Sequence, residues 1–154
     1  MMSHRVYVRG LWACTIAILA ISGFQALSGH WVALFLFWPG FQSLGKYMGL
    51  LNSLASLHRV FGFLTGGLSV VTLVFALLAR PRMLVRLSSI VGLGVVGLAV
   101  IGGILYVTSV FKDRWSLGQM ADAFVGVFAV YFVQLLLMTI SSRTQRAVAA
   151  GQRE

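Results

Sequence analysis

The sequence predicts an all-α integral membrane protein built as a four-helix bundle, and three observations support this. Of its 154 residues, 59% are hydrophobic and only 10% are charged, and the mean hydropathy is +0.93. A soluble domain usually carries about a quarter charged residues. Four apolar runs are each long enough to cross a hydrocarbon core of about 30 Å as a helix. These features exclude an ordinary soluble enzyme, a disordered tail and a nucleic-acid-binding domain.

The first apolar run extends over about 8–27 and follows a basic N-terminal segment. It is too long for the core of a cleaved signal peptide and three more runs follow, so we expect a retained span. The helix can extend to Trp38, because Pro39 would end it. The next segment, 28–56, is also apolar. We expect it to lie on the outer membrane surface, either as a lid over a site or as an interfacial helix.

The second and third runs cover about 57–79 and 87–110, and the fourth covers about 120–140. The Arg-Pro-Arg sequence at 80–82 makes a short connection between the second and third runs, which predicts an antiparallel neighbouring pair. The third run is rich in glycine, which indicates tight packing or a homo-oligomer surface. Its glycines are Gly92, Gly94, Gly97, Gly102 and Gly103. The chain therefore forms a single membrane domain over 1–154.

The positive charges of the loops predict the orientation, since Lys and Arg concentrate on the cytoplasmic side. With four spans, eight of the twelve basic residues fall on the side of the termini and four on the other side. We expect both termini to be cytoplasmic, in the cell inner (cytoplasmic) membrane. The eight are Arg5, Arg9, Arg80, Arg82, Arg86, Arg143, Arg146 and Arg153, and the four are Lys46, Arg59, Lys112 and Arg114.

Polar residues held at membrane depth are the first place to look for function, because they are expensive there. The chain has three acidic residues, and only Asp122 lies near the start of a span. His58 and Arg59 lie at the outer start of the second span, at a similar depth. We expect Asp122 to pair with Arg59, or with His58, and to tie helix two to helix four. Such a pair is more often structural than functional.

Helical spacing places small residues below these polar groups. Two stripes result, namely His58, Gly62, Gly66 and Ser69 on helix two, and Gln119, Asp122, Gly126 and Ala129 on helix four. Small residues at this spacing usually let helices approach closely. They would equally leave room for a flat cofactor with His58 as an axial ligand, and the two interpretations stay open.

Other chemistry finds little support in the sequence. The histidines His4, His30 and His58 form no close pair, and Cys14 is the single cysteine, so a zinc or di-iron site is not expected. The middle of each helix carries few hydroxyl or amide groups, which is sparse for a conduction pathway. Those noted are Thr65, Ser69, Thr72, Tyr106, Thr108, Tyr131 and Gln134. A transporter therefore ranks last.

The sequence Leu-His-Arg-Val-Phe-Gly at 57–62 resembles the His-Arg-x-x-Gly opening of the second helix in heme A synthases, whose halves are four-helix bundles. The chain is similar to one such half from about Arg9 to Ile140, including a first helix that ends near Gln25. A second, shorter resemblance joins Ser56–Arg59 to the Ser-x-His-Arg start of a membrane-anchor helix in succinate dehydrogenases, where Ser and Arg face a quinone.

The first resemblance implies a heme held by histidines of helices two and four. His58 matches the helix-two ligand, while the helix-four position falls near Gln119 and is not histidine. An acidic residue that often precedes the first ligand is replaced by Ala55. A heme b could be held by His58 with Met120 or His30 as the other ligand, since a His and Met pair is ordinary chemistry. The resemblance therefore implies an incomplete cofactor site.

Two functions remain in competition. The first is a non-catalytic accessory or assembly subunit of a membrane complex of the respiratory type, in contact with lipid and with other membrane subunits or a second copy. The alternative is a small heme- or quinone-binding electron-transfer module. Its expected site residues are His58, Gly62, Gly66, Gln119, Met120 and Asp122, with His58 as the metal ligand.

Overall fold

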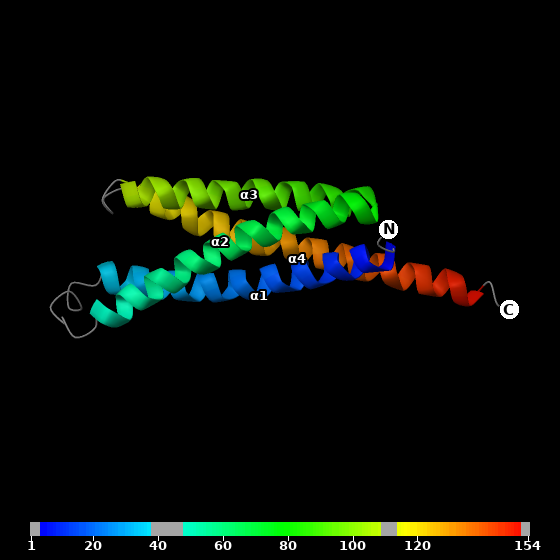
Figure 1. The fold of residues 1–154 in the computed structure, drawn as a ribbon, viewed down its shortest axis with the longest axis horizontal. Helices are drawn as coiled ribbons and strands as arrows, with labels where there is room; N and C mark the ends of the chain where they lie inside the picture. The colour runs from blue at the N-terminus through cyan, green and yellow to red at the C-terminus, as the bar shows by residue number, and fades with distance from the viewer. Residues whose placement is uncertain (1–3, 38–47, 109–113, 152–154) are drawn as a thin grey trace.

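The protein forms four long helices in a computed structural model that describes residues 4–37, 48–108 and 114–151. They are α1 (His4–Phe37), α2 (Met48–Ala79), α3 (Met83–Thr108) and α4 (Arg114–Gly151). No strand occurs in the described ranges. The helices run up and down along one axis, and both termini lie at the same end (Figure 1). The all-α four-helix bundle predicted from the sequence is confirmed.

Each helix contains one segment long and apolar enough to cross a membrane. The four segments are His4–Ser28, Ser56–Ala79, Met83–Leu105 and Asp122–Thr144. All of their ends lie close to those of the predicted spans, and the largest difference is at the C-terminal end of the third, which stops at Leu105 instead of 110. The protein is therefore a multi-pass integral membrane protein.

Part of the segment expected at the outer surface, 28–56, belongs to the spanning helices, and α1 reaches Phe37, close to the end expected at Trp38. Residues 28–37 continue α1 and residues 48–56 begin α2, while 38–47 lie outside the described residues. The cause is in the sequence, because 28–37 contains no proline and the first helix-breaking residue is Pro39. The two helices therefore extend beyond the length needed for the membrane. Whether 38–47 forms a lid stays a prediction.

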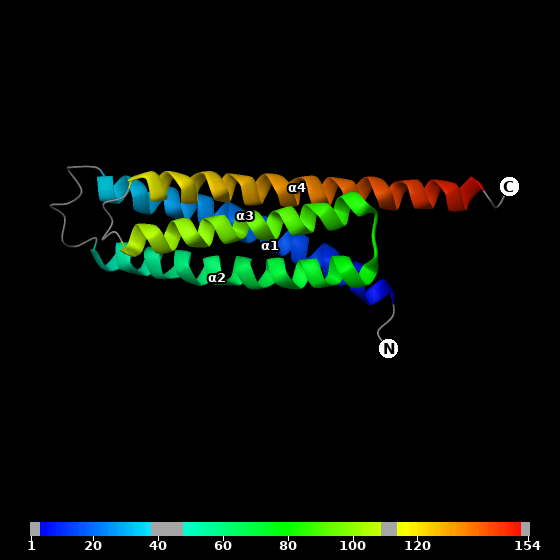
Figure 2. The same cartoon turned by 90° about the horizontal axis from the view of Figure 1, so that it is seen from above.

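The helices pack around a square. In the described part of the chain, α1 contacts α2 and α4, and α3 contacts α2 and α4, so α2 and α4 lie diagonally opposite. At the end that holds the termini, called here the terminal end, the short turn brings α2 and α3 together. Toward the other end, the distal end, α2 leaves α3 and approaches α1 (Figure 1), and a perpendicular view shows the same four rods (Figure 2). The four helices thus enclose one interior.

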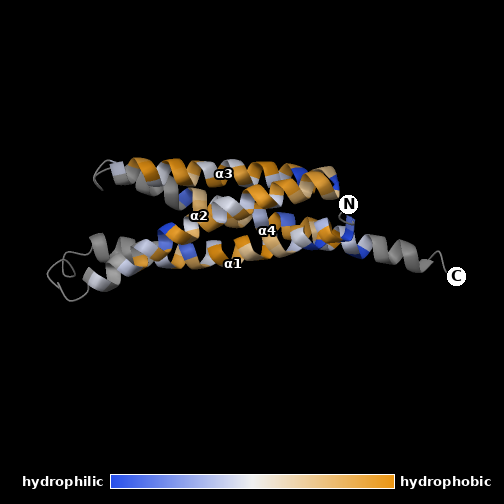
Figure 3. Ribbon diagram, viewed as in Figure 1, coloured by the Kyte–Doolittle hydropathy of each residue, from blue (hydrophilic) through white to orange (hydrophobic). Residues whose placement is uncertain are grey.

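Hydrophobic residues are spread along all four helices (Figure 3), and many of them face outward. Large side chains such as Phe63 and Val125 are 79% and 68% exposed, as a lipid-facing surface requires. Near the terminal end, a buried apolar layer closes the interior. It consists of Leu11, Ala76, Val85 and Met138, one from each helix. The bundle is therefore apolar toward lipid and sealed by apolar packing at one end.

The turn between α2 and α3 contains the one described non-glycine residue in the left-handed region, Arg80, with φ of 44°. It ends α2, and Pro81 follows it, as is common after a helix C-terminus. The amide of Val85 then donates to the carbonyl of Arg82 at 2.9 Å and starts α3. The left-handed conformation disfavours residues with a Cβ.

Replacement of Arg80 by glycine is expected to stabilise the folded protein by up to about 1 kcal/mol, because glycine adopts this conformation without a steric cost. Thermal unfolding of the purified protein in detergent measures the change. Arg80→Ala is the control, since it removes the charge and keeps the Cβ. An equal stability gain in both variants would assign the effect to the charge and contradict the prediction.

Candidate functional site

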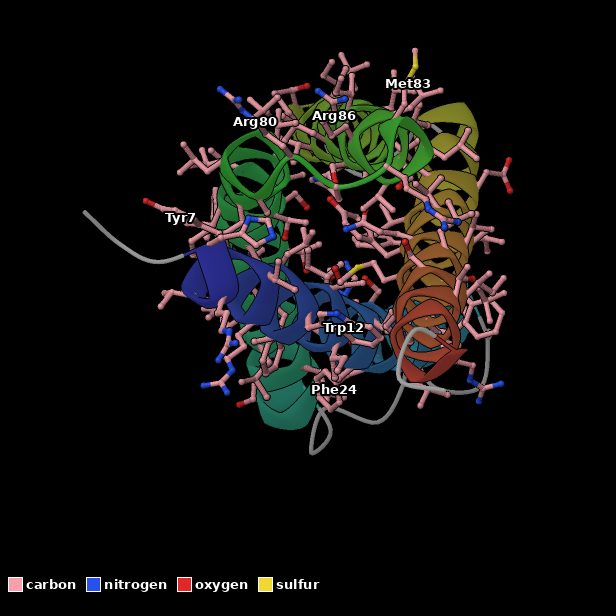
Figure 4. All side chains as sticks on the ribbon, turned by 90° about the vertical axis from the view of Figure 1, so that its right-hand side faces the viewer. Tyr7, Trp12, Phe24, Arg80, Met83 and Arg86 are labelled. Carbon is pink, nitrogen blue, oxygen red and sulfur yellow. The ribbon has the colours of Figure 1, made fainter. Side chains whose placement is uncertain are left out.

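The interior of the bundle is lined by polar side chains that come from all four helices. The fully or almost fully buried ones are Thr15, Ser22, Gln25 and Ser28 on α1, Thr65, Ser69 and Thr72 on α2, Ser89 on α3, and Gln134 on α4. Side chains fill the space between the helices when the bundle is viewed from the terminal end, while Arg80 and Met83 point outward (Figure 4). Polar groups in a membrane bundle usually bond across helices.

At the distal end, Gln25 joins α1 to α2. Its Oε1 accepts a hydrogen bond from the Thr65 hydroxyl at 3.0 Å, and its Nε2 donates to the backbone carbonyl of His58 at 3.4 Å. The Thr65 hydroxyl also lies 2.9 Å from the carbonyl of Phe61 in its own helix. Both polar atoms of the Gln25 amide are therefore engaged with the neighbouring helix.

His58 points into the bundle at the same end. Its Nδ1 lies 3.4 Å from the Ser28 hydroxyl of α1. Its ring packs edge-on against Phe124 of α4, with the ring centroids 5.6 Å apart and the planes at 69°. His58 thereby links α2 to α1 and to the diagonal helix α4, and we name these contacts with those of Gln25 and Thr65 the distal network.

Nearer the terminal end, Gln134 joins three helices. Its Nε2 donates to Thr15 of α1 at 2.9 Å, and its Oε1 lies 3.1 Å from the Ser89 hydroxyl and 3.2 Å from the Ser88 hydroxyl of α3. Each serine also lies within hydrogen-bond distance of the Val85 carbonyl, so its single proton has two acceptors. We name this set the terminal network.

Two buried hydroxyls that belong to neither network lie between the two networks. Ser22 Oγ and Tyr131 OH have no hydrogen-bond partner among the described residues, although the two side chains are 1% and 0% exposed. The Tyr131 hydroxyl faces Ser69 of α2 but makes no hydrogen bond with it. Buried hydroxyls without a partner are rare in native proteins.

The predicted site residues are distributed differently. On α2, Gly62 faces Gln25, whereas a Cβ at Gly66 would meet no atom within 4 Å. On α4, Asp122 is exposed and Gly126 packs against Val95 of α3. The side chains of Gln119, Met120 and His30 lie outside the described residues. Arg59 is exposed, and its pairing with Asp122 stays a prediction.

A flat cofactor below His58 would have to occupy the groove at Gly62. A Cβ added there would lie 3.4 Å from Gln25 Nε2, so the amide of Gln25 already fills this groove. A macrocycle against Gly62 would require Gln25 to leave both of its hydrogen bonds. The described residues therefore do not fit a heme at this place, and close packing explains the glycine at 62.

Sequence reasoning missed most of the polar lining of α1, and it also missed Ser89. Thr15, Ser22 and Ser28 are single hydroxyls inside apolar runs, and such residues are common in membrane helices because the hydroxyl can bond to the preceding turn. Thr15 and Ser22 are seven residues apart and lie on one face of a helix, and Gln25 and Ser28 follow at steps of three residues toward the edge of that face. Read together with Gln25, that spacing would have indicated a polar inner face.

Comparison of this chain with protein-family models, with curated proteins and with solved structures gives no match in any of the three. The class of the protein rests on the geometry above. It is a multi-pass integral membrane protein whose four helices enclose hydrogen-bonded polar side chains. The relation to heme A synthases stays a prediction from the motif at 57–62.

The packing of Tyr131 predicts opposite effects for two glycines of α3. A Cβ at Gly92 would lie 2.8 Å from the Tyr131 ring, whereas one at Gly94 would meet nothing within 4 Å. We expect Gly92→Ala to destabilise the bundle by about 1–3 kcal/mol through overpacking. Gly94→Ala, the matched control, should be neutral or stabilise by up to about 1 kcal/mol through helix propensity. Denaturant titration in mixed micelles measures both, and equal effects would contradict the packing described.

Replacement of Gln134 by leucine removes the centre of the terminal network at nearly constant volume. We expect a loss of only about 0.5–1.5 kcal/mol, because interhelical hydrogen bonds in membrane proteins are modest. The hydroxyls of Thr15, Ser88 and Ser89 also keep acceptors in their own helices. The same titration measures the change. A loss above about 3 kcal/mol would mean that these hydroxyls depend on Gln134.

Proposed function

We propose that this protein is a non-catalytic accessory or assembly subunit of a larger membrane complex, of the respiratory type, in the inner (cytoplasmic) membrane. The observation that carries the proposal is a pair of outward-facing glycines. Gly67 of α2 and Gly94 of α3 are exposed, and a Cβ at either would meet nothing within 4 Å. Each falls at the middle of its membrane-crossing segment.

Outward glycines at mid-membrane expose helix backbone among large apolar side chains. Their neighbours on the surface include Phe63, Val71 and Leu98. Association of helices in lipid depends on close approach of backbones, and small residues permit it. The inward glycines Gly62 and Gly92 are used within the chain, whereas Gly67 and Gly94 are available to a helix of another subunit.

The side chains that face the interior also support a structural role, because they are engaged in contacts between helices. His58, the side chain with the greatest capacity for cofactor chemistry, lies against Ser28 and Phe124. Gln25 and Gln134 hold helices together. These contacts favour an assembled bundle that presents its outer face to other subunits over one that holds a heme or quinone.

Bulky residues at the outward glycines should prevent assembly without unfolding the subunit. We expect Gly67→Leu and Gly94→Leu to keep the melting temperature of the isolated protein within about 2 °C, since both sites are open. In the same variants, the amount of the subunit found in a high-mass complex on native electrophoresis of solubilised membranes should fall at least tenfold. Val125→Leu enlarges an exposed residue of α4 and is the control. A complex that persists in both glycine variants would overturn the proposal.

The visible absorption spectrum separates this proposal from the electron-transfer alternative. Protein purified from membranes is expected to be colourless, because Gln25 occupies the groove below His58. A Soret band that disappears in His58→Ala would favour the heme-binding alternative over the structural role. Gln25→Ala is the informative companion, since it empties the groove and leaves His58 in place.

A further inference from the structure

The two unpartnered hydroxyls lie between the distal and terminal networks. Tyr131 packs against Ile18 of α1, and Ser22 lies one turn from Ile18 on the same helix. Toward the distal end, the next turns carry Gln25 and Thr65, and toward the terminal end they carry Thr15 and Gln134. The gap between the networks, from Thr15 to Gln25 along α1, is therefore about three helical turns long and contains both orphan groups.

Neither hydroxyl can obtain a partner from outside the bundle. Both side chains are at least 99% buried, so neither bulk water nor lipid headgroups reach them. A hydroxyl without a hydrogen bond is costly inside a protein, and more so in hydrocarbon. The hydroxyl of a serine or threonine on a helix commonly donates to a carbonyl in the preceding turn, as those of Thr15, Ser69 and Thr72 do here. Ser22 does not.

A third polar group faces the same region. The Ser69 hydroxyl donates to the Thr65 carbonyl at 2.8 Å, which leaves its oxygen free to accept. The Tyr131 hydroxyl faces Ser69 without a hydrogen bond between them. Two donors and one acceptor from three helices thus lie at the same level of the interior, and a buried water typically requires two to four such partners.

We infer that water binds at Ser22, Ser69 and Tyr131 and connects α1, α2 and α4 by hydrogen bonds in the gap between the two networks. The Ser69 bond to the Thr65 carbonyl extends this connection to the distal network. The water accepts hydrogen bonds from the hydroxyls of Tyr131 and Ser22 and donates one to the hydroxyl oxygen of Ser69. The polar interior stops short of the terminal end, because Leu11, Ala76, Val85 and Met138 form an apolar layer there. The bundle therefore contains a hydrated polar file on one side of an apolar seal, independent of any accessory role.

A double-mutant cycle on Ser22→Ala and Tyr131→Phe tests the shared water. If water satisfies both hydroxyls, each single variant lowers the melting temperature by about 2–4 °C. The double variant then loses no more than the larger single loss, because the shared bond is already gone. Ser142→Ala, whose hydroxyl bonds only within α4, is combined with Tyr131→Phe as the control and should give additive losses.

The opposite results overturn the inference. Removal of a hydroxyl that truly lacks a partner raises the melting temperature or leaves it unchanged, and independent hydroxyls give additive losses. A second readout does not depend on stability. In lipid vesicles with ¹³C-labelled tyrosine, magnetisation transfer from water to the side chain of Tyr131 is expected, identified by its loss in Tyr131→Phe. It should fall at least twofold in Ser22→Ala, and the lack of transfer in the wild type would also overturn the inference.

Discussion

The structure depends on one constraint, which is that hydrocarbon offers no hydrogen-bond partner to a polar group. The backbone meets this constraint by forming four continuous helices. The side chains meet it by turning their hydroxyl and amide groups toward one another. Gln25 and Gln134 matter most, because a single amide both donates and accepts and can therefore connect two or three helices. Positioning of His58 follows from the same constraint, since Ser28 and the Gln25 amide meet it from α1.

Glycines divide into two groups by what lies next to them. Gly62 and Gly92 make room for an amide and for an aromatic ring inside the chain, while Gly67 and Gly94 face outward with open space. The first group explains how polar and aromatic side chains fit into a narrow interior. The second group is what a subunit of a larger assembly would be expected to present. A glycine-rich composition therefore has two separate causes in one molecule.

The fold was predictable because it follows from composition and length. Four apolar runs and a short Arg-Pro-Arg connection were enough for the number of helices and their antiparallel order. The interior was less predictable, because the direction in which a single hydroxyl points depends on how helices rotate about their axes. Thr65, Ser69 and Thr72 were noted as too sparse for a pathway, yet with Thr15, Ser22 and Gln25 they line one interior.

The stripe of small residues on helix four also shows that the sequence does not determine which helix a given face contacts. Its regular spacing predicted that it would face helix two, but Asp122 is exposed and Gly126 packs on α3. The contact of α4 with His58 instead comes from Phe124, an apolar residue that is not a member of the stripe. Periodicity identifies a face of a helix, while the neighbour of that face is set by the packing of the whole bundle.

The length of α4 has a practical consequence for imaging. The helix has 38 residues, or about 57 Å of continuous rod, whereas the hydrocarbon core needs about 30 Å. Its membrane-crossing segment ends at Thr144, and the helix continues to Gly151, so it protrudes past the other three (Figure 1). A helical fusion partner joined in register after Gly151 would inherit a fixed direction from the bundle. It would serve as a fiducial marker for electron microscopy of a molecule that is otherwise too small to align.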